Sequence, residues 1–511
     1  MKKDKAEMRT SHTFRGWSCA VAVMAAVTTL PVAAAEKEPQ TSPGVQKVPY
    51  DPKVFRPDPS YDDKPYDAQK QLDVYGGKRD IDEPRPLLEL GRTLYLEGPL
   101  PGGYNIIGSK NLVNPSLQAY GDLRTAVAFN DNGNVETAQV ATRLNLEVDL
   151  QLTSTERVHA FLRPFDQNGQ FSRYEFGGDD HLRGKGIFDL NVDTLFFEGD
   201  IGSIMTGLTD TYKSYDLPVA AGLMPLIFQN GVWVEDAITG GAFAIPAMNS
   251  QMLGISNMDI SFFAGFDKVS TPAIRDDRNA FADHSVNVYG VATFIEANQG
   301  YWEAGFGRVD GEDGFDELSY NSATVAFTRR YGGLISNSVR GIWTFGQNRD
   351  RNRQQTADGT ILLIESSLIT HLPSTLVPYL NVFAGFDRPQ SLLRDAGAGG
   401  VLKNTGINFE TDGLTGFPKL DDTGQNTWGG AIGLQYLFNL DQQIVVEAAT
   451  VQLISDDVEL GRPAPGEQYA VGIRYQLPLT KALIFRTDAI YGWRDEVQDI
   501  AGVRGELRLK F

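Results

Sequence analysis

The segment 140–152 alternates apolar and polar residues without interruption. One set of alternate positions holds Val140, Thr142, Leu144, Leu146, Val148, Leu150 and Leu152, and the other holds Arg143, Asn145, Glu147, Asp149 and Gln151. Because successive side chains of a β-strand point to opposite faces of its sheet, this pattern predicts a strand with one apolar and one charged face. About ten residues suffice for a tilted strand to cross the hydrocarbon layer of a bilayer, so this strand is long enough to span it.

The same alternation recurs along the chain and ends at Phe511. It predicts strands near 116–129, 140–152, 155–165, 188–200, 201–209, 250–257, 258–267, 285–297, 300–309, 318–330, 333–346, 360–371, 375–387, 426–438, 442–454, 466–477, 480–494 and 500–511. From about residue 250, short turns alternate with long polar loops, as in a closed barrel with its short turns at one rim. We therefore expect an all-β fold, a transmembrane antiparallel up-and-down barrel of about 18 strands, with 16 as the alternative.

Other architectures fit the sequence less well. A soluble sandwich has shorter strands with the polar face outermost, and a propeller has a blade repeat of about 40–50 residues that this chain lacks. After the N-terminal segment, no run of 18 apolar residues is present, which excludes spanning helices. A closed barrel can still cross a bilayer, because it pairs every backbone donor and acceptor within the sheet.

The N-terminal region differs in texture from the rest of the chain. Residues 1–35 have a basic start, an apolar run and small residues before Glu36, which predicts a signal peptide cleaved near Ala35. Residues 36–110 are rich in proline and are expected to form an extended periplasmic arm or plug, with a short strand near 87–96. The barrel is expected to cover 111–511.

Composition excludes several classes of function. Acidic residues outnumber basic ones by 65 to 46, a formal net charge of −19, so binding of nucleic acid through its phosphates is not expected. With Cys19 as the one cysteine, disulfide frameworks, cysteine zinc sites and c-type haem attachment are excluded. We expect no metal, cofactor or enzymatic activity, since the Gly-x-Ser-x-Gly and His-Glu-x-x-His signatures are absent. An outer-membrane hydrolase remains a disfavoured alternative.

The charged phase of the best strands predicts the residues that face the interior of the barrel. The expected pore-lining residues are Arg124, Arg143, Glu147, Asp149, Arg157, Arg163, Arg474, Arg486, Asp488, Arg504, Glu506 and Arg508. Opposed charges in a narrow lumen sort solutes by charge, although such pairs can also simply stabilise a wet interior.

Two segments are candidates for the constriction. The stretch 210–249 is unusually apolar for a loop and is expected to fold inward, with Phe228, Trp233, Glu235 and Asp236 as constriction residues. The alternative is that 217–228 is simply another strand. The long polar loop 388–425 is the second candidate to set the aperture.

The final strand, Val503 to Phe511, alternates apolar and charged residues and ends in an aromatic residue. Together with the signal peptide, it resembles Gram-negative porin-like outer-membrane proteins. The resemblance implies an outer-membrane location, passage of small hydrophilic solutes, contact with membrane lipid and lipopolysaccharide, insertion by the barrel-assembly machinery through Phe511, and a possible homotrimer. A structural or conduit barrel that serves a periplasmic or export complex is the alternative.

Overall fold

The computed structural model describes residues 84–91, 102–167, 170–179, 183–349, 354–370, 376–410, 413–438, 442–454 and 466–511. The chain divides into two compact units after Glu83, and every described residue belongs to the second unit. The expected signal peptide and residues 36–83 of the expected arm lie outside the described residues.

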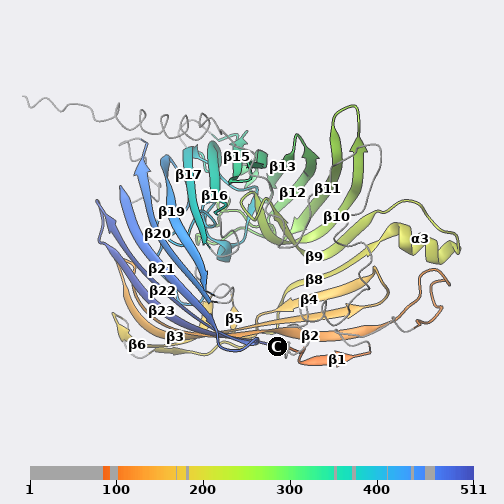
Figure 1. The fold of residues 1–511 in the computed structure, drawn as a ribbon, viewed down its shortest axis with the longest axis horizontal. Helices are drawn as coiled ribbons and strands as arrows, with labels where there is room; N and C mark the ends of the chain where they lie inside the picture. Colours follow the sequence, from red (N-terminus) through yellow and green to blue (C-terminus); the bar gives the residue numbers. More distant parts are fainter. Residues whose placement is uncertain are drawn as a thin grey trace, which may run out of the picture. The chain divides into compact units, whose positions relative to one another are not determined.

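Eighteen antiparallel strands form a closed barrel (Figure 1). They are β2 (Ser116–Asp131), β3 (Glu136–Gln151), β4 (Arg157–Leu162), β8 (Val192–Asp200), β9 (Pro218–Phe228), β10 (Val234–Ser250), β11 (Ile255–Asp267), β12 (Val286–Ala297), β13 (Gly300–Gly311), β14 (Tyr320–Tyr331), β15 (Ile335–Phe345), β16 (Asp358–Leu368), β17 (Leu376–Arg388), β19 (Thr427–Phe438), β20 (Gln442–Leu453), β21 (Gln468–Pro478), β22 (Leu483–Arg494) and β23 (Ile500–Lys510). The ring closes where β2 pairs with β23, from Asp122↔Lys510 to Asp131↔Ala501.

Shorter elements lie outside the 18 strands of the barrel. They are β1 (Leu88–Leu90), β5 (Asp166–Gln167), β6 (Gln170–Gly178), β7 (Arg183–Lys185), β18 (Leu393–Arg394), the helix α3 (Ile201–Thr209) and the 3₁₀ turns η3 (Asp316–Leu318) and η4 (Ala396–Ala398). β1 pairs with the start of β2, which confirms the short strand expected near residue 87. Among the described residues, no helix is long and apolar enough to cross a membrane.

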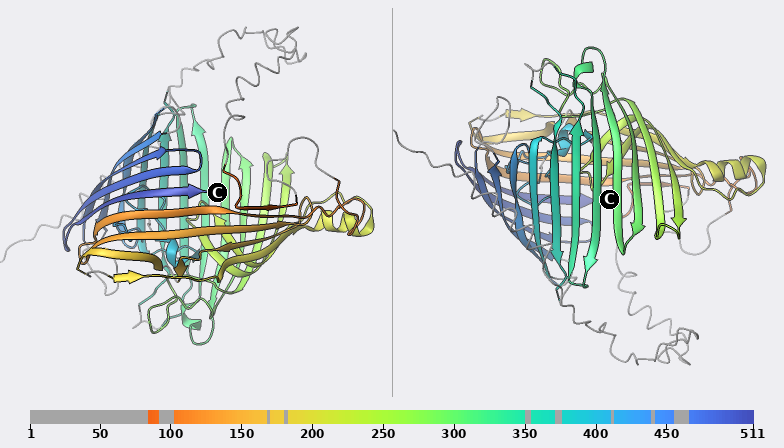
Figure 2. Two further views of the ribbon diagram at one scale, coloured as in Figure 1. Left: turned by 90° about the horizontal axis from the view of Figure 1, so that it is seen from below. Right: turned by 90° about the horizontal axis from the view of Figure 1, so that it is seen from above.

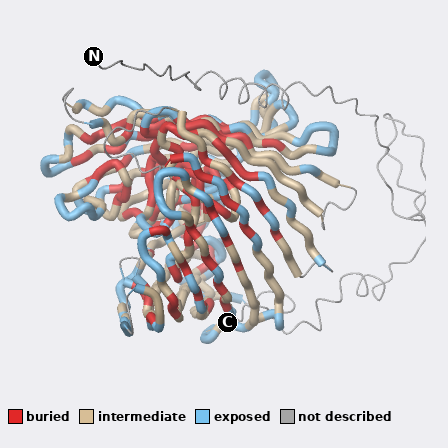
Figure 3. Tube along the Cα trace, turned by 90° about the vertical axis from the view of Figure 1, so that its left-hand side faces the viewer, coloured by how far each residue is buried: buried red, intermediate tan, exposed pale blue. Residues whose placement is uncertain are grey.

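Alternation along each strand gives the barrel two different faces. On the outer face, Val127, Phe129 and Val503 are 41%, 56% and 54% exposed, whereas the intervening Ala126 and Ala128 are fully buried. Buried and exposed residues follow one another along the strands in Figure 3. The outer face thus carries exposed apolar side chains, and the inner face carries small, charged and buried ones.

The expected number of strands is confirmed, but two of its members were wrong. Residues 201–209 form α3, because their apolar residues recur at helical spacing and the Asp200 side chain caps the helix by accepting from the Ser203 backbone N–H at 2.7 Å. Residues 250–257 form no strand of their own, since a turn at 251–254 joins β10 to β11. The strands β9 and β10 take their places, so the two errors cancel.

Candidate functional site

The connection between β9 and β10, residues 229–233, folds into the lumen. Trp233 at its end is fully buried, and its indole N–H donates to Ser322 Oγ on β14 at 3.0 Å. A Cβ atom on Gly305 of β13 would lie 2.4 Å from the Trp233 ring, so only glycine leaves room for the indole at this point of the wall. The connection therefore reaches from one part of the barrel wall to strands several places further round the ring.

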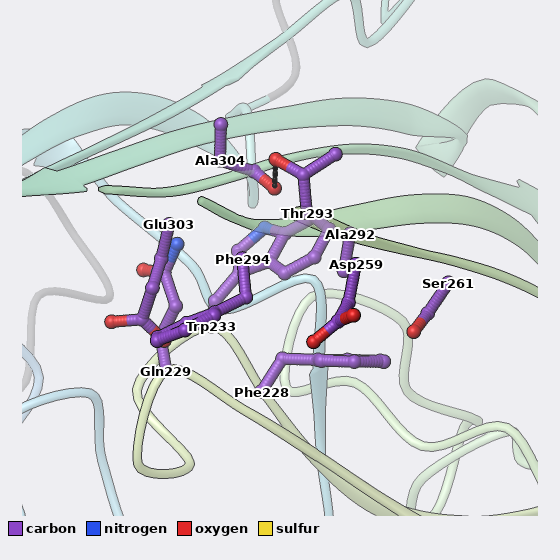
Figure 4. Close-up of a pocket in the computed structure, with 10 residues that line it drawn as sticks. All are labelled: Phe228, Gln229, Trp233, Asp259, Ser261, Ala292, Thr293, Phe294, Glu303 and Ala304. Carbon is purple, nitrogen blue, oxygen red and sulfur yellow. Dashed lines mark hydrogen bonds between the residues drawn. The ribbon is translucent and has the colours of Figure 1, made fainter. Parts of the chain in front are cut away.

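A cavity of about 80 Å³ lies beside Trp233 (Figure 4). The aromatic rings of Phe228 and Trp233 border it, and the carboxylates of Asp259 and Glu303 come from β11 and β13, the strands on either side of β12. Asp259 Oδ1 accepts from the Ala247 backbone N–H at 2.7 Å. This cavity is thus lined by aromatic and acidic groups.

A second and longer segment, residues 389–426 between β17 and β19, begins against the first. Within it, β18 pairs in parallel with Val234–Glu235 of β10. The Tyr320 hydroxyl donates to the Leu392 carbonyl oxygen at 2.9 Å. The buried Arg394 contacts Glu235 at 3.2 Å and donates to the Val232 carbonyl oxygen at 3.1 Å. These contacts join the two inward segments into one body.

The middle of segment 389–426 is fastened to Glu447 on β20. The two carboxylate oxygens of this buried residue accept from the backbone N–H groups of Ile407 and Asn408, each at 2.9 Å. Asn408 Nδ2 also donates to Glu447 at 2.9 Å, and the Tyr379 hydroxyl is a further donor. One carboxylate that accepts several hydrogen bonds from the same loop is a strong anchor.

The far part of segment 389–426 reaches the arginines of the last strands. Glu410 pairs with Arg474 and Arg486, and the Arg504 guanidinium lies 5.1 Å from the centre of the Phe417 ring. Further on, the Thr415 carbonyl oxygen accepts from Asn130 of β2 at 2.8 Å and from Gln139 of β3 at 2.5 Å. The segment therefore crosses the lumen from β10 to β2 and β3.

No protein-family model matches the sequence, and no curated protein matches it either. Solved structures are similar in fold. Pseudomonas aeruginosa OccK2 (OpdF) matches at 9% identity and OpdK, solved with vanillate, at 11% identity. Each match covers 77% of this chain and 98% of the other, with a TM-score of 0.50. The chain therefore shares the closed β-barrel fold of these structures.

Most charges expected to face the lumen of the barrel occur in ion pairs. The ion pairs that include these residues are Arg124–Glu506 (2.7 Å), Arg508–Asp122 (2.7 Å), Arg157–Asp149 (3.2 Å), Arg157–Glu198, Arg163–Asp193 (2.7 Å) and Arg163–Asp166 (3.1 Å). Glu147 lies 3.3 Å from the His159 imidazole, and this contact is an ion pair only when the imidazole is protonated. Arg143 instead lies over the Phe171 ring, 5.4 Å from its centre. That these residues line a path for solutes stays a prediction.

Asp488 is the centre of the densest charged group, which we name the Asp488 cluster: Asp488, Arg474, Arg486, Arg504 and Glu410. Its carboxylate contacts Arg474 at 2.6 Å, Arg486 at 2.9 Å and Arg504 at 2.7 Å. Sequence alternation singled out the four strand residues of this cluster. It could not find Glu410, because a loop has no periodicity that fixes which side chains point inward.

The interpretation of 210–249 needs correction. Phe228 ends β9, and Glu235 and Asp236 belong to β10, so most of this stretch forms two strands of the wall, as the alternative for 217–228 held. An apolar run is ambiguous here, because a barrel strand and an inward loop both bury it. Trp233 and the short connection around it are the part that enters the lumen.

Glu447 is a site residue that the sequence interpretation missed. It is the single charged residue in the run Ile444 to Ala449 of a strand that was expected. A buried charge inside such a run requires a partner, and here the partners are backbone groups of a loop distant in sequence. The charge could have identified Glu447 as a candidate site residue, whereas the sequence does not indicate which groups this side chain contacts.

Asp421 lies within segment 389–426 and makes the stability of the segment's folded position depend on pH. Burial and the neighbouring Asp422 raise the pKa of Asp421 from 3.8 to about 6. A carboxyl group with a raised pKa stabilises the folded arrangement below its unfolded pKa, and this contribution is lost as the pH rises through about 6. We therefore expect the segment to be held more firmly at pH 5 than at pH 7.5.

The corresponding prediction is that fluctuations of an open channel are more frequent at pH 7.5 than at pH 5, and that Asp421→Asn removes the difference. Current recordings at both pH values measure it. Asp277→Asn, in the exposed part of the 268–285 loop, serves as the control and should keep the wild-type pH dependence. Equal pH dependence in the Asp421→Asn variant and the wild type would contradict the prediction.

Proposed function

We propose that this chain is a channel in the outer membrane of a Gram-negative bacterium and passes small hydrophilic solutes by diffusion. The observation that carries the proposal is the closed ring of 18 strands with an exposed apolar outer face and a charged inner face. A barrel of this size has an interior wide enough for water unless something fills it. Here segment 389–426 fills part of it, so passage is expected to be selective.

The two inward segments support a restricted opening. They are fastened by buried hydrogen bonds and ion pairs at Trp233, Arg394 and Glu447, and such contacts hold a loop in one position. OpdK, one of the barrels with this fold, was solved with vanillate, a precedent for a bound small molecule.

The partners of the channel are part of the proposal. The apolar outer face suits acyl chains, and the acidic loop residues Asp276, Asp277, Glu312 and Asp313 suit lipopolysaccharide bridged by divalent cations. The backbone of Phe511 pairs with Gly121, at 2.8 and 3.0 Å, so the terminal residue lies in the barrel wall. This position fits a terminal strand that the barrel-assembly machinery reads. Association of three copies remains a prediction.

Single-channel recording tests the function. The purified full-length chain is added to a planar bilayer in about 1 M KCl, where salt screens the surface charge. It is expected to give discrete conductance steps. A preparation unfolded by heating serves as the control and should stay silent. Absence of steps from the folded protein would overturn the channel and leave the structural or conduit barrel.

A further inference from the structure

The helix α3 leaves its large apolar side chains only partly buried, and one of them is exposed. Ile201, Ile204, Met205 and Leu208 lie at i, i+3, i+4 and i+7 and form one stripe, and Leu208 is 63% exposed. The residues of the helix that are buried are the small ones, Gly202, Thr206 and Gly207. A surface helix of a soluble protein has the opposite arrangement, with its large apolar residues against the core.

The small-residue face of α3 is fixed against residues 107–111. A Cβ atom on Gly108 would lie 1.8 Å from the carbonyl oxygen of Gly207, so the two backbones touch. The buried Asn111 donates to the Ser203 carbonyl oxygen at 3.3 Å and to Glu156 Oε2 at 2.9 Å. Hydrogen bonds from Thr153, Thr155 and Asn111 lower the pKa of Glu156, although burial opposes them, which keeps this anchor charged. The helix therefore cannot roll to bury its stripe.

The position of α3 places this stripe next to the outer face of the barrel. On β8, Leu195 is 46% exposed and shares the outer face with Phe197, and α3 begins directly after this strand. The helix lies in a connection at the rim of the short turns, beyond the end of β8 in both views of Figure 2. Tyr212 and Tyr215, 79% and 48% exposed, follow the helix.

We propose that α3 is an interfacial helix that inserts its apolar stripe into the phospholipid leaflet at the periplasmic rim. This inference rests on the proposed membrane location. Three features favour lipid over a protein partner. The stripe continues from an outer strand face, the helix contains no charged residue, and tyrosines flank it, as at membrane–water interfaces. Lys213, just beyond the helix, is suitably placed for lipid phosphate.

Fluorescence quenching by lipid tests the inference. Leu208→Cys, Leu195→Cys and Asn279→Cys are made separately and labelled with an environment-sensitive dye, which reacts at one site because Cys19 belongs to the signal peptide expected to be cleaved. Leu195 reports the barrel wall, and Asn279, exposed in a long loop, reports water. The full chain is reconstituted in vesicles of phosphatidylethanolamine and phosphatidylglycerol with or without bromine on the upper acyl chain. The Leu208 and Leu195 labels should both lose roughly half of their fluorescence or more in brominated lipid, and the Asn279 label should not.

The outcomes separate the helix from the barrel. If the Leu195 label is quenched and the Leu208 label is not, the interfacial helix is overturned while the membrane barrel stands. Iodide in the buffer then tells whether water or another protein surface covers the stripe, and either result rejects the lipid contact. If neither label is quenched, the membrane location itself fails and the inference fails with it.

Discussion

Replacing residues 390–424 by a short glycine–serine turn should raise the single-channel conductance on the order of three-fold, because the segment that crosses the lumen is then absent. The barrel wall tolerates this deletion, since β17 and β19 are adjacent and pair from Gly385↔Thr427 onward. Conductance in planar bilayers and the mobility of unheated protein on SDS gels measure opening and folding separately.

A matched deletion controls for loop shortening as such. The tip of the 268–285 loop, residues 276–280, is held by an isolated bridge between Arg275 and Phe281 and can be replaced by a two-residue turn. This variant should conduct like the wild type. If the 390–424 deletion folds and its conductance is also unchanged, segment 389–426 does not restrict the pore.

Asp488→Asn should shift the channel strongly toward anions. In the wild type, Asp488 and Glu410 face three arginines, and the substitution leaves Glu410 alone against them. Loss of one partner from a buried ion pair costs about 3–5 kcal/mol, because Arg504, only 3% exposed, loses its carboxylate. We expect a reversal potential displaced toward that of chloride in a KCl gradient, and a lower unfolding temperature.

Asp277→Asn removes the same charge from an exposed loop and serves as the comparison. It should leave both the reversal potential and the unfolding temperature near the wild-type values, since exposed charges are screened by salt. An anion shift of equal size in both variants would show that total charge sets selectivity and that the Asp488 cluster does not.

The wall of the barrel was predictable from the sequence because its signal is local. Each spanning strand repeats an apolar residue every second position, and this is visible in segments such as 140–152 and 466–477 without knowledge of their neighbours. The same rule failed at 201–209, where glycines and a helical apolar stripe were mistaken for alternation. It also left β9 as an alternative and passed over β10, because the small and apolar residues of these strands alternate weakly.

The contents of the lumen were predictable only in part. The arginines and acids of the strands follow from alternation, but the groups they meet depend on how two loops fold inward. Glu410, Asn408 and Leu392 gain their roles from contacts with residues far away in sequence. No periodic pattern indicates such contacts. The sequence could therefore predict that the segment narrows the lumen, but it could not predict which residues the segment contacts.

The contacts of segment 389–426 bear on when this segment can reach its final position during folding. The residues that it contacts belong to β10, β20, β22, β2 and β3. The full set of these contacts requires β20 and β22, which follow the segment in the chain, as well as β2, β3 and β10, which precede it. We therefore expect the segment to reach its final position only after the strands that follow it have been added, so that a barrel still being assembled has a wider lumen than the finished one.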